Sequence, residues 1–215
     1  MPLILSSVVM FVVLTGDIVA SGRVRDREGL LERLVEAMGF LTARLSPWVL
    51  SPFRVVRGDE FQGLLSALFP VPMALLELKV RLRPFRVRVG VGQGELSTRV
   101  MEDVSLMDGE AFRRAAEALR VAKAERREVV FRTGMGQVDE VAEMLYPLME
   151  ALWGRWRDEL WRRFGLLLEG RGLKEIAREV GVSYQAVHRD FQRGGVMRVL
   201  EATRGFERWL EGQGG

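Results

Sequence analysis

Residues 53–65 constrain the fold more than any other stretch of this chain. Apolar and β-branched residues lead into Gly58-Asp59 and apolar residues follow, which is the pattern of a β-hairpin with a tight turn. The turn presents the carboxylates of Asp59 and Glu60 to water or to a ligand. Such oxygen ligands suit a small hard cation such as Mg²⁺. The alternative is a solvated turn, in which Asp and Gly are common for backbone reasons alone.

A third acid is expected at the end of a buried strand. The valine-rich run predicts a central strand over Val8–Thr15, and Gly16-Asp17 follows it directly. An acid at the carboxyl end of such a strand, before a small-residue loop and a helix, is a common position for a ligand. Free N–H groups in the loop suit phosphate, and an ordinary strand–helix loop is the alternative.

The apolar run at the N-terminus does not predict a membrane span. Leu3–Leu14 is shorter than the ~20 apolar residues that a span needs. A secretory signal requires a basic region before its apolar run, and the first basic residue is Arg23. We therefore expect a cytoplasmic protein with no membrane partner. Residues 1–8 are interpreted as a frayed end or as the result of an early start codon, because Met10 also fits a start.

Helices and strands alternate through the N-terminal two thirds of the chain. Gly90, Gly92 and Gly94 stand at alternate positions after one predicted strand and permit close approach of backbone or ligand. The pattern predicts an α+β fold, ferredoxin-like or palm-like, in which helices cover a mixed sheet. The other expected elements are a helix from an Asp26 cap to about Leu45, a loop between Pro47 and Pro52, a helix over 70–82, a strand over 85–91, a helix over 110–126 and a strand over 128–133.

The chain is expected to be wholly helical from Val138 onward. This predicts a palm-like domain over residues 1–135 and an all-α domain over 136–215. The segment 151–215 holds 12 Lys and Arg against 9 Asp and Glu, whereas residues 1–150 hold 20 of each. The excess favours an anionic partner such as nucleic acid at this end. Its tryptophans are expected in the core or an interface rather than stacked on bases: Trp153, Trp156 and Trp161.

Residues 172–193 have the spacing of a helix-turn-helix motif. Ala177 is small where two helices would cross, Gly181 suits a turn with positive φ, and Val187 would pack back on the first helix. This spacing resembles sigma-factor region 4 and related regulators. The resemblance implies a DNA reader, with contact to another protein as the alternative. Because one such helix gives limited affinity, a homodimer is expected.

The exposed side of this motif offers groups that recognise DNA. In the major groove Gln pairs with adenine and Arg with guanine, and basic residues nearby would contact phosphates. His188 fits a base contact and a plain surface position equally well. The residues expected at the DNA are Ser183 as the N-cap of the second helix, Tyr184, Gln185, His188 and Arg189 on its exposed face, and Lys174, Arg178 and Arg193 at phosphates.

Three segments in this order resemble the palm-like domain of class III nucleotidyl cyclases and GGDEF diguanylate cyclases: Thr15–Ile18, Arg57–Phe61 and Val87–Gly92. In those families an acid on the first strand and an acid in the hairpin hold two Mg²⁺ ions that bind a nucleoside triphosphate. The resemblance implies that Asp17 and Asp59 are catalytic and bind Mg²⁺ or Mn²⁺. The Ile18 carbonyl and Glu60 would join them as metal ligands.

The same resemblance implies a set of phosphate-binding residues. Residues 115–127 resemble the late helix of GGDEF domains, in which a lysine reaches phosphate. Lys123 is one of only three lysines in the chain and stands at that position, and a plain surface lysine is the alternative. The implied phosphate-binding residues are Ala20, Ser21, Gly22 and Lys123.

Some positions depart from these families. Arg57 replaces the first glycine of the GGDEF signature, and Arg113 and Glu117 replace the Asn and Arg that stabilise the cyclase transition state. These departures argue against ordinary cyclase activity but leave metal or nucleotide binding intact. Over nearly its whole length the chain most closely resembles the SatD family, through its GDI, GDEFQ, VGVGQGELST and DGEAFRRA segments. That resemblance implies fold and architecture more than activity.

Composition excludes several kinds of site and leaves three functions open. With no Cys and a single His, the chain has no thiolate metal site, no cysteine nucleophile and no His-rich zinc site. The lack of Cys and Asn beside many Arg fits a thermophile or a GC-rich genome. We favour a DNA-binding regulator whose palm-like domain binds Mg-nucleotide. The alternatives are an active nucleotidyltransferase or nucleotide cyclase, and a protein-interaction adaptor with a degenerate palm-like domain.

Overall fold

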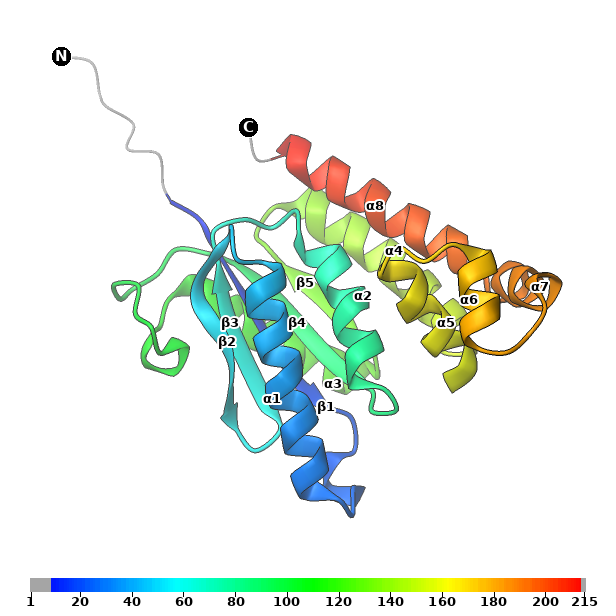
Figure 1. Cartoon of the computed structure of the whole chain (residues 1–215). Coiled ribbons are helices and arrows are strands. Elements are labelled where there is room, and N and C mark those ends of the chain that lie inside the picture. The colour runs from blue at the N-terminus through cyan, green and yellow to red at the C-terminus, as the bar shows by residue number, and fades with distance from the viewer. Residues whose placement is uncertain (1–8, 214–215) are drawn as a thin grey trace.

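The computed structural model describes residues 9–213 as one sheet surrounded by helices (Figure 1). Two 3₁₀ turns, at Ser21–Arg23 and Val104–Leu106, lie in the connections. None of the helices in the described part of the chain is long and apolar enough to cross a membrane. The elements are β1 (Phe11–Ile18), α1 (Arg27–Arg44), β2 (Val49–Arg57), β3 (Glu60–Leu65), α2 (Val71–Leu82), β4 (Val87–Gly94), α3 (Glu110–Glu125), β5 (Val129–Arg132), α4 (Gly136–Trp153), α5 (Asp158–Leu168), α6 (Leu173–Glu179), α7 (Tyr184–Gly194) and α8 (Val196–Gln213).

The strands form a mixed sheet in the order β2-β3-β1-β4-β5. β1 lies in the centre and pairs antiparallel with β3 and β4, while β5 pairs parallel with β4. The run from β1 to β4 is the ferredoxin-like β-α-β-β-α-β arrangement. The predicted α+β fold with a palm-like mixed sheet covered by helices is therefore confirmed.

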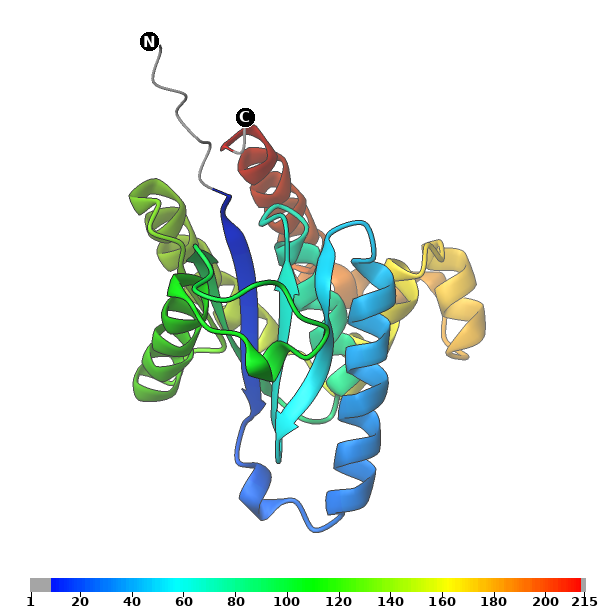
Figure 2. The ribbon, with the colours of Figure 1, turned by 90° about the vertical axis from the view of Figure 1, so that its left-hand side faces the viewer.

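Helices cover both faces of the sheet because the central strands are apolar on both sides. Val12 and Leu14 of β1 share a buried cluster with α1 and α2, whereas Val13 between them shares one with Ala111 and Ala115 of α3. Alternate strand residues point to opposite faces, so one strand serves both layers. Figure 2 shows the sheet edge-on between α1 on one side and α3 on the other.

The glycines of β4 let α3 approach the sheet closely. A Cβ on Gly92 would lie 2.2 Å from the Ala115 nitrogen, and one on Gly90 would lie 2.3 Å from the Ala115 carbonyl oxygen. Both distances are far inside van der Waals contact, so these positions accept no side chain. The sequence left open whether these glycines permit close approach of backbone or of a ligand. Gly90 and Gly92 permit close approach of the α3 backbone.

The C-terminal helices pack on the same core as the sheet. Phe131 of β5 contacts Tyr146 of α4 and Phe206 of α8, with ring centroids 5.3 and 5.8 Å apart. Trp153, which ends α4, is 2 % exposed. Trp156 and Trp161 are also buried, so the expected core position of all three tryptophans is confirmed. The boundary between residues 135 and 136 stays a prediction, although apolar contacts are continuous across it.

A buried carboxylate joins the sheet to α2 and α4. Glu128, just before β5, accepts hydrogen bonds from Lys79 Nζ at 2.7 Å and from the Trp153 indole at 2.9 Å. Its other oxygen pairs with Arg86 at 2.7 Å. Burial alone would raise the pKa of Glu128, but the two cations outweigh it and lower the pKa from 4.5 to about 2. The side chain is therefore ionised across the physiological range.

The expected bounds of the first strand are wrong. β1 runs over Phe11–Ile18 instead of Val8–Thr15, because Asp17 and Ile18 still pair with Arg88 and Val87 of β4. Asp17 thus belongs to the strand and not to the loop after it. The interpretation of residues 1–8 lies outside the described residues.

The expected loop between Pro47 and Pro52 is also wrong in part. β2 begins at Val49 and contains Pro52. Its pairing with β3 shifts register between Ser51 and Arg54, so the missing N–H of the proline breaks no regular ladder. β2 is an edge strand, which is where a strand accommodates proline.

Candidate functional site

The fold brings the acids of β1 and of the β2–β3 hairpin together. Gly58 takes the left-handed conformation, with φ of 59°, that the tight turn requires. The hairpin therefore presents Asp59 to the end of β1, where the Ile18 N–H donates a hydrogen bond to Asp59 Oδ2 at 3.1 Å. These residues are 41 positions apart in the sequence. The structure thus brings Asp17, Ile18 and Asp59 to one end of the sheet.

Lys123, in the last turn of α3, reaches the same place from the other layer. Its ammonium lies 2.7 Å from Asp17 Oδ2 and 3.7 Å from Glu60 Oε1. Burial would lower the pKa of Lys123, but the hydrogen bond and the charges of both acids raise it. Lys123 is thus a partly exposed, protonated group paired with the predicted metal ligands, and its role at phosphate stays a prediction.

The carboxylates partly fit a divalent cation. Asp17 Oδ1 is buried and has no hydrogen-bond partner, which leaves one acceptor for a ligand. Within residues 9–213, however, no three acid or histidine side chains are placed to hold a metal ion as they stand. The Lys123 ammonium lies between Asp17 and Glu60, where a cation would bind. The oxygen donors suit Mg²⁺ or Mn²⁺ once that ammonium moves away.

An arginine-lined hollow of about 640 Å³ lies at the same end of the sheet, and its wall includes Arg88, which stands opposite Asp17 in the register of β1 and β4. Ala20 and Gly22 of the predicted phosphate loop form part of its wall, whereas the Ser21 carbonyl accepts a hydrogen bond from Arg27 at 2.8 Å. The one carboxylate in the wall, Glu128, is already paired. Of its five arginines, Arg86 pairs with Glu128 and Arg127 with Glu143, and the guanidinium groups of the other three make the hollow suitable for phosphate. Its arginines are Arg23, Arg86, Arg88, Arg126 and Arg127.

Sequence reasoning missed most of this hollow. Its arginines come from the loop after β1, from the start of β4 and from the end of α3, so no local motif contains them. The alternation of apolar residues and arginines along β4 could have indicated part of it. In the sheet register this alternation sets Arg88 opposite Asp17. Arg127 ends the segment 115–127 that resembles the late helix of GGDEF domains, and that resemblance implies no role for it.

The residues predicted to contact DNA lie on α6 and α7. A turn at Gly181, with φ of 71°, joins the two helices, and the Ser183 side chain accepts a hydrogen bond from the Ala186 N–H at 3.2 Å. Ala177 and Val187 are buried between them as expected. Figure 1 places the pair on the side of the molecule away from the β2–β3 hairpin. The exposed side chains are Lys174, Arg178, Tyr184, Gln185, His188, Arg189 and Arg193, and the Tyr184 and His188 rings stack with centroids 5.9 Å apart.

Solved structures similar to this chain include nucleotide cyclases. A bacterial light-regulated adenylyl cyclase matches with a TM-score of 0.41 and 14% identity, over 57% of this chain and 75% of that one. The guanylate cyclase domain of RhGC from Catenaria anguillulae, in complex with GTP, has a TM-score of 0.39 and 15% identity, over 52% and 72%. The GGDEF domain of DgcB from Caulobacter crescentus, in complex with c-di-GMP, has a TM-score of 0.37 and 15% identity, over 58% and 77%.

The comparison of sequences is more specific. No protein with a curated description matches this chain. The model of the SatD family matches residues 11–180, which include the whole sheet, the acids at its end and α6. This confirms the expectation from the GDI, GDEFQ and later segments. The chain belongs to the SatD family.

Proposed function

We propose that this protein binds a nucleoside triphosphate, or another nucleotide, together with Mg²⁺ at the end of β1. One observation carries the proposal: a buried carboxylate with a free oxygen, that of Asp17, stands opposite Arg88 in the sheet register, and Arg88 lines a hollow together with four other arginines. A carboxylate that suits a cation next to guanidinium groups that suit phosphate is the arrangement that a metal–polyphosphate complex requires. The hairpin and α3 complete it with Asp59, Glu60 and Lys123.

Each side chain of this site has a separate task in the proposal. Asp17, Asp59 and Glu60 hold the cation together with the Ile18 carbonyl, and the Ile18 N–H fixes the orientation of Asp59. A bound Mg²⁺ would neutralise phosphate charge and polarise a phosphoryl oxygen. Lys123 is within reach of the same space and exchanges its carboxylate partners for phosphate when the ligand arrives. Catalytic roles for Asp17 and Asp59 remain a prediction, and Arg113 and Glu117 argue for binding without turnover.

The test is equilibrium titration of the full chain with each nucleoside triphosphate in Mg²⁺ or Mn²⁺, with chromatography of any product. We expect stabilisation against heat by at least one nucleotide. Arg88→Gln should weaken that binding by about 10- to 100-fold, since a charge-assisted hydrogen bond is lost. Arg120→Gln, an exposed change on α3 outside the hollow, serves as the control. No shift with any nucleotide, or equal effects of the two variants, would refute the site, and a new phosphodiester product would make the protein an enzyme.

A second candidate function is DNA binding by α7. Its support is a row of exposed groups on one short helix, Gln185, His188 and Arg189, that can hydrogen-bond base edges. The Ser183 cap fixes the start of that helix. In this proposal Lys174, Arg178 and Arg193 contact phosphates, and a homodimer supplies the second reading helix.

Arg189→Ala should weaken binding to duplex DNA by about tenfold or more, because a base or phosphate contact is worth about 1–3 kcal/mol. The measurement is the dissociation constant for duplex DNA at several salt concentrations, with Arg208→Ala, an exposed change on α8, as the control. A loss of about one unit in the salt slope would assign Arg189 to a phosphate. Unchanged affinity and slope would remove the DNA proposal and favour a protein-interaction adaptor.

A further inference from the structure

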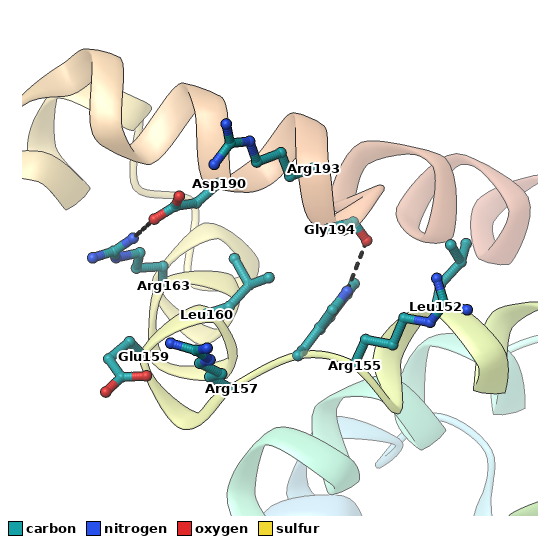
Figure 3. A pocket seen from close by; sticks show the side chains of 10 residues that line it. Leu152, Arg155, Arg157, Glu159, Leu160, Arg163, Asp190, Arg193 and Gly194 are labelled. Carbon is teal, nitrogen blue, oxygen red and sulfur yellow. Dashed lines mark hydrogen bonds and ion pairs between the residues drawn. The ribbon is translucent and has the colours of Figure 1, made fainter.

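A second arginine-lined pocket lies far from the acids of β1. It has a volume of about 530 Å³ and lies between the α4–α5 connection and α7 (Figure 3). Volumes of this order are usual for sites that hold small molecules. Three separate elements contribute to its wall, so the pocket exists only when α7 is docked on the helices before it.

The charges of this pocket do not cancel. Arg163 forms an ion pair with Asp190, as Figure 3 shows, and that pair is neutral. Three further arginines remain, Arg155, Arg157 and Arg193, against the single carboxylate of Glu159. All three are exposed, and none of them pairs with a carboxylate in the part of the chain that the structure describes. The pocket therefore has an unneutralised positive rim.

The floor of the pocket is apolar and tightly fixed. Leu152, Leu160 and Trp156 line it, and the Trp156 indole N–H donates to the Gly194 carbonyl at 2.7 Å. A Cβ at Gly194 would lie 2.6 Å from Leu160 Cδ2, so α7 meets α5 without space between them. A fixed apolar floor below a cationic rim suits a ligand with a flat or aliphatic body and an anionic end.

We propose that this pocket binds a small organic phosphate, of the size and chemistry of a mononucleotide, without a metal ion. Arg157 before α5 and Arg193 on α7 line opposite sides of the pocket, and a guanidinium group can form paired hydrogen bonds to a phosphate group. A metal ion has no place here, because one of the two carboxylates is already paired with Arg163. The site is independent of the nucleotide site proposed at β1.

A ligand held in this way would link two parts of the helical region. Arg155 and Arg157 precede α5, which packs on α2 and thus on the sheet, whereas Arg193 belongs to α7. Because α7 is already docked on α5, a phosphate bonded to both sides would stabilise this arrangement further, and with it the position of the exposed face of α7 that carries Gln185 and Arg189. The role of the pocket is therefore that of an effector site that stabilises the docked helix.

The experiment is calorimetric titration of the full chain with AMP in excess EDTA, which removes binding that requires a metal. We expect AMP to bind, and the double variant Arg157→Gln/Arg193→Gln to raise its dissociation constant by about 100-fold, since each arginine contributes at least about tenfold. Arg189→Gln, one turn earlier on α7 and outside the pocket, should bind AMP as the unchanged protein does. Thermal unfolding of each variant checks that the helices stay docked.

Three results would overturn this inference. In the first, AMP does not bind in EDTA, and in the second, the double variant binds AMP as tightly as the unchanged protein does. In the third result, AMP binding is lost in Arg88→Gln and kept in the double variant. AMP would then bind in the hollow near the end of β1 and not in this pocket. A parallel titration with duplex DNA tests whether these arginines bind the phosphates of DNA instead of those of a small molecule. DNA binding that the double variant weakens, in a protein that ignores AMP, would make these arginines backbone contacts and refute an effector pocket.

Discussion

Replacement of Glu128 by glutamine is expected to lower the free energy of unfolding by about 3–5 kcal/mol, because it removes the directly bonded counter-charge of the buried Lys79 ammonium and leaves only the more distant Glu150 carboxylate. Lys79 Nζ lies 2.7 Å from Glu128, and both side chains are almost fully buried. Arg86 would lose less, since its guanidinium is largely exposed. Denaturant unfolding at neutral pH measures the change, and Asp158→Asn, which breaks the exposed pair with Arg83, should cost less than about 1 kcal/mol.

The same residue predicts how stability depends on pH. The pKa of Glu128 is about 2 in the folded protein, below its ordinary value of 4.5. A carboxylate whose pKa is lowered by folding stabilises the folded protein at pH values above its pKa in the unfolded chain. This contribution to the free energy of unfolding is lost as the pH falls from 4.5 towards 2. The difference corresponds to roughly 3 kcal/mol. Acid unfolding that is equally steep in Glu128→Gln and in the unchanged protein would contradict this assignment.

Replacement of Asp17 by asparagine should abolish the metal dependence of nucleotide binding. We expect a loss of about 100-fold or more in affinity for the metal–nucleotide complex. Mutation of residues that only orient metal ligands already lowers metal affinity by about 10- to 100-fold, and Asp17 is a predicted ligand itself. Asparagine keeps the shape of the side chain, so the pairing of β1 with β4 should persist. Titration of nucleotide with and without Mg²⁺ measures the effect, and Glu32→Gln, an exposed change on α1, is the matched loss of one negative charge.

The opposite change is expected at Lys123. Lys123→Met removes the ammonium from the space between Asp17 and Glu60, so affinity for Mn²⁺ alone should rise by about tenfold as charge repulsion disappears. Affinity for nucleotide should fall, because phosphate loses a cationic partner. Lys174→Met on α6 is the control for the loss of one lysine. Unchanged or weaker Mn²⁺ binding in Lys123→Met would show that the ammonium does not stand where the metal binds.

The hairpin and the strand–acid arrangement could be predicted because their signals are local. Gly58 marks a turn by its own conformational freedom, and the valine run before Asp17 marks a buried strand. The end of β1 was misplaced because it depends on pairing with residues 87 and 88, far along the chain. The sequence predicted only Ala20 and Gly22 of the arginine hollow, and it did not predict the α5–α7 pocket. Each gathers side chains from several elements, and only the packing of those elements makes them neighbours.

The two edges of the sheet limit how copies of this protein can associate. β2 and β5 each have one side with no neighbouring strand within residues 9–213, and bare edges of this kind invite strand addition and aggregation. In β2 the ladder is interrupted by Pro52 and by register shifts, and β5 is only four residues long. Neither edge offers a straight run of free N–H and C=O groups. Extension of the sheet from one molecule to the next is thereby discouraged, and helical surfaces are left as the places where two copies can meet.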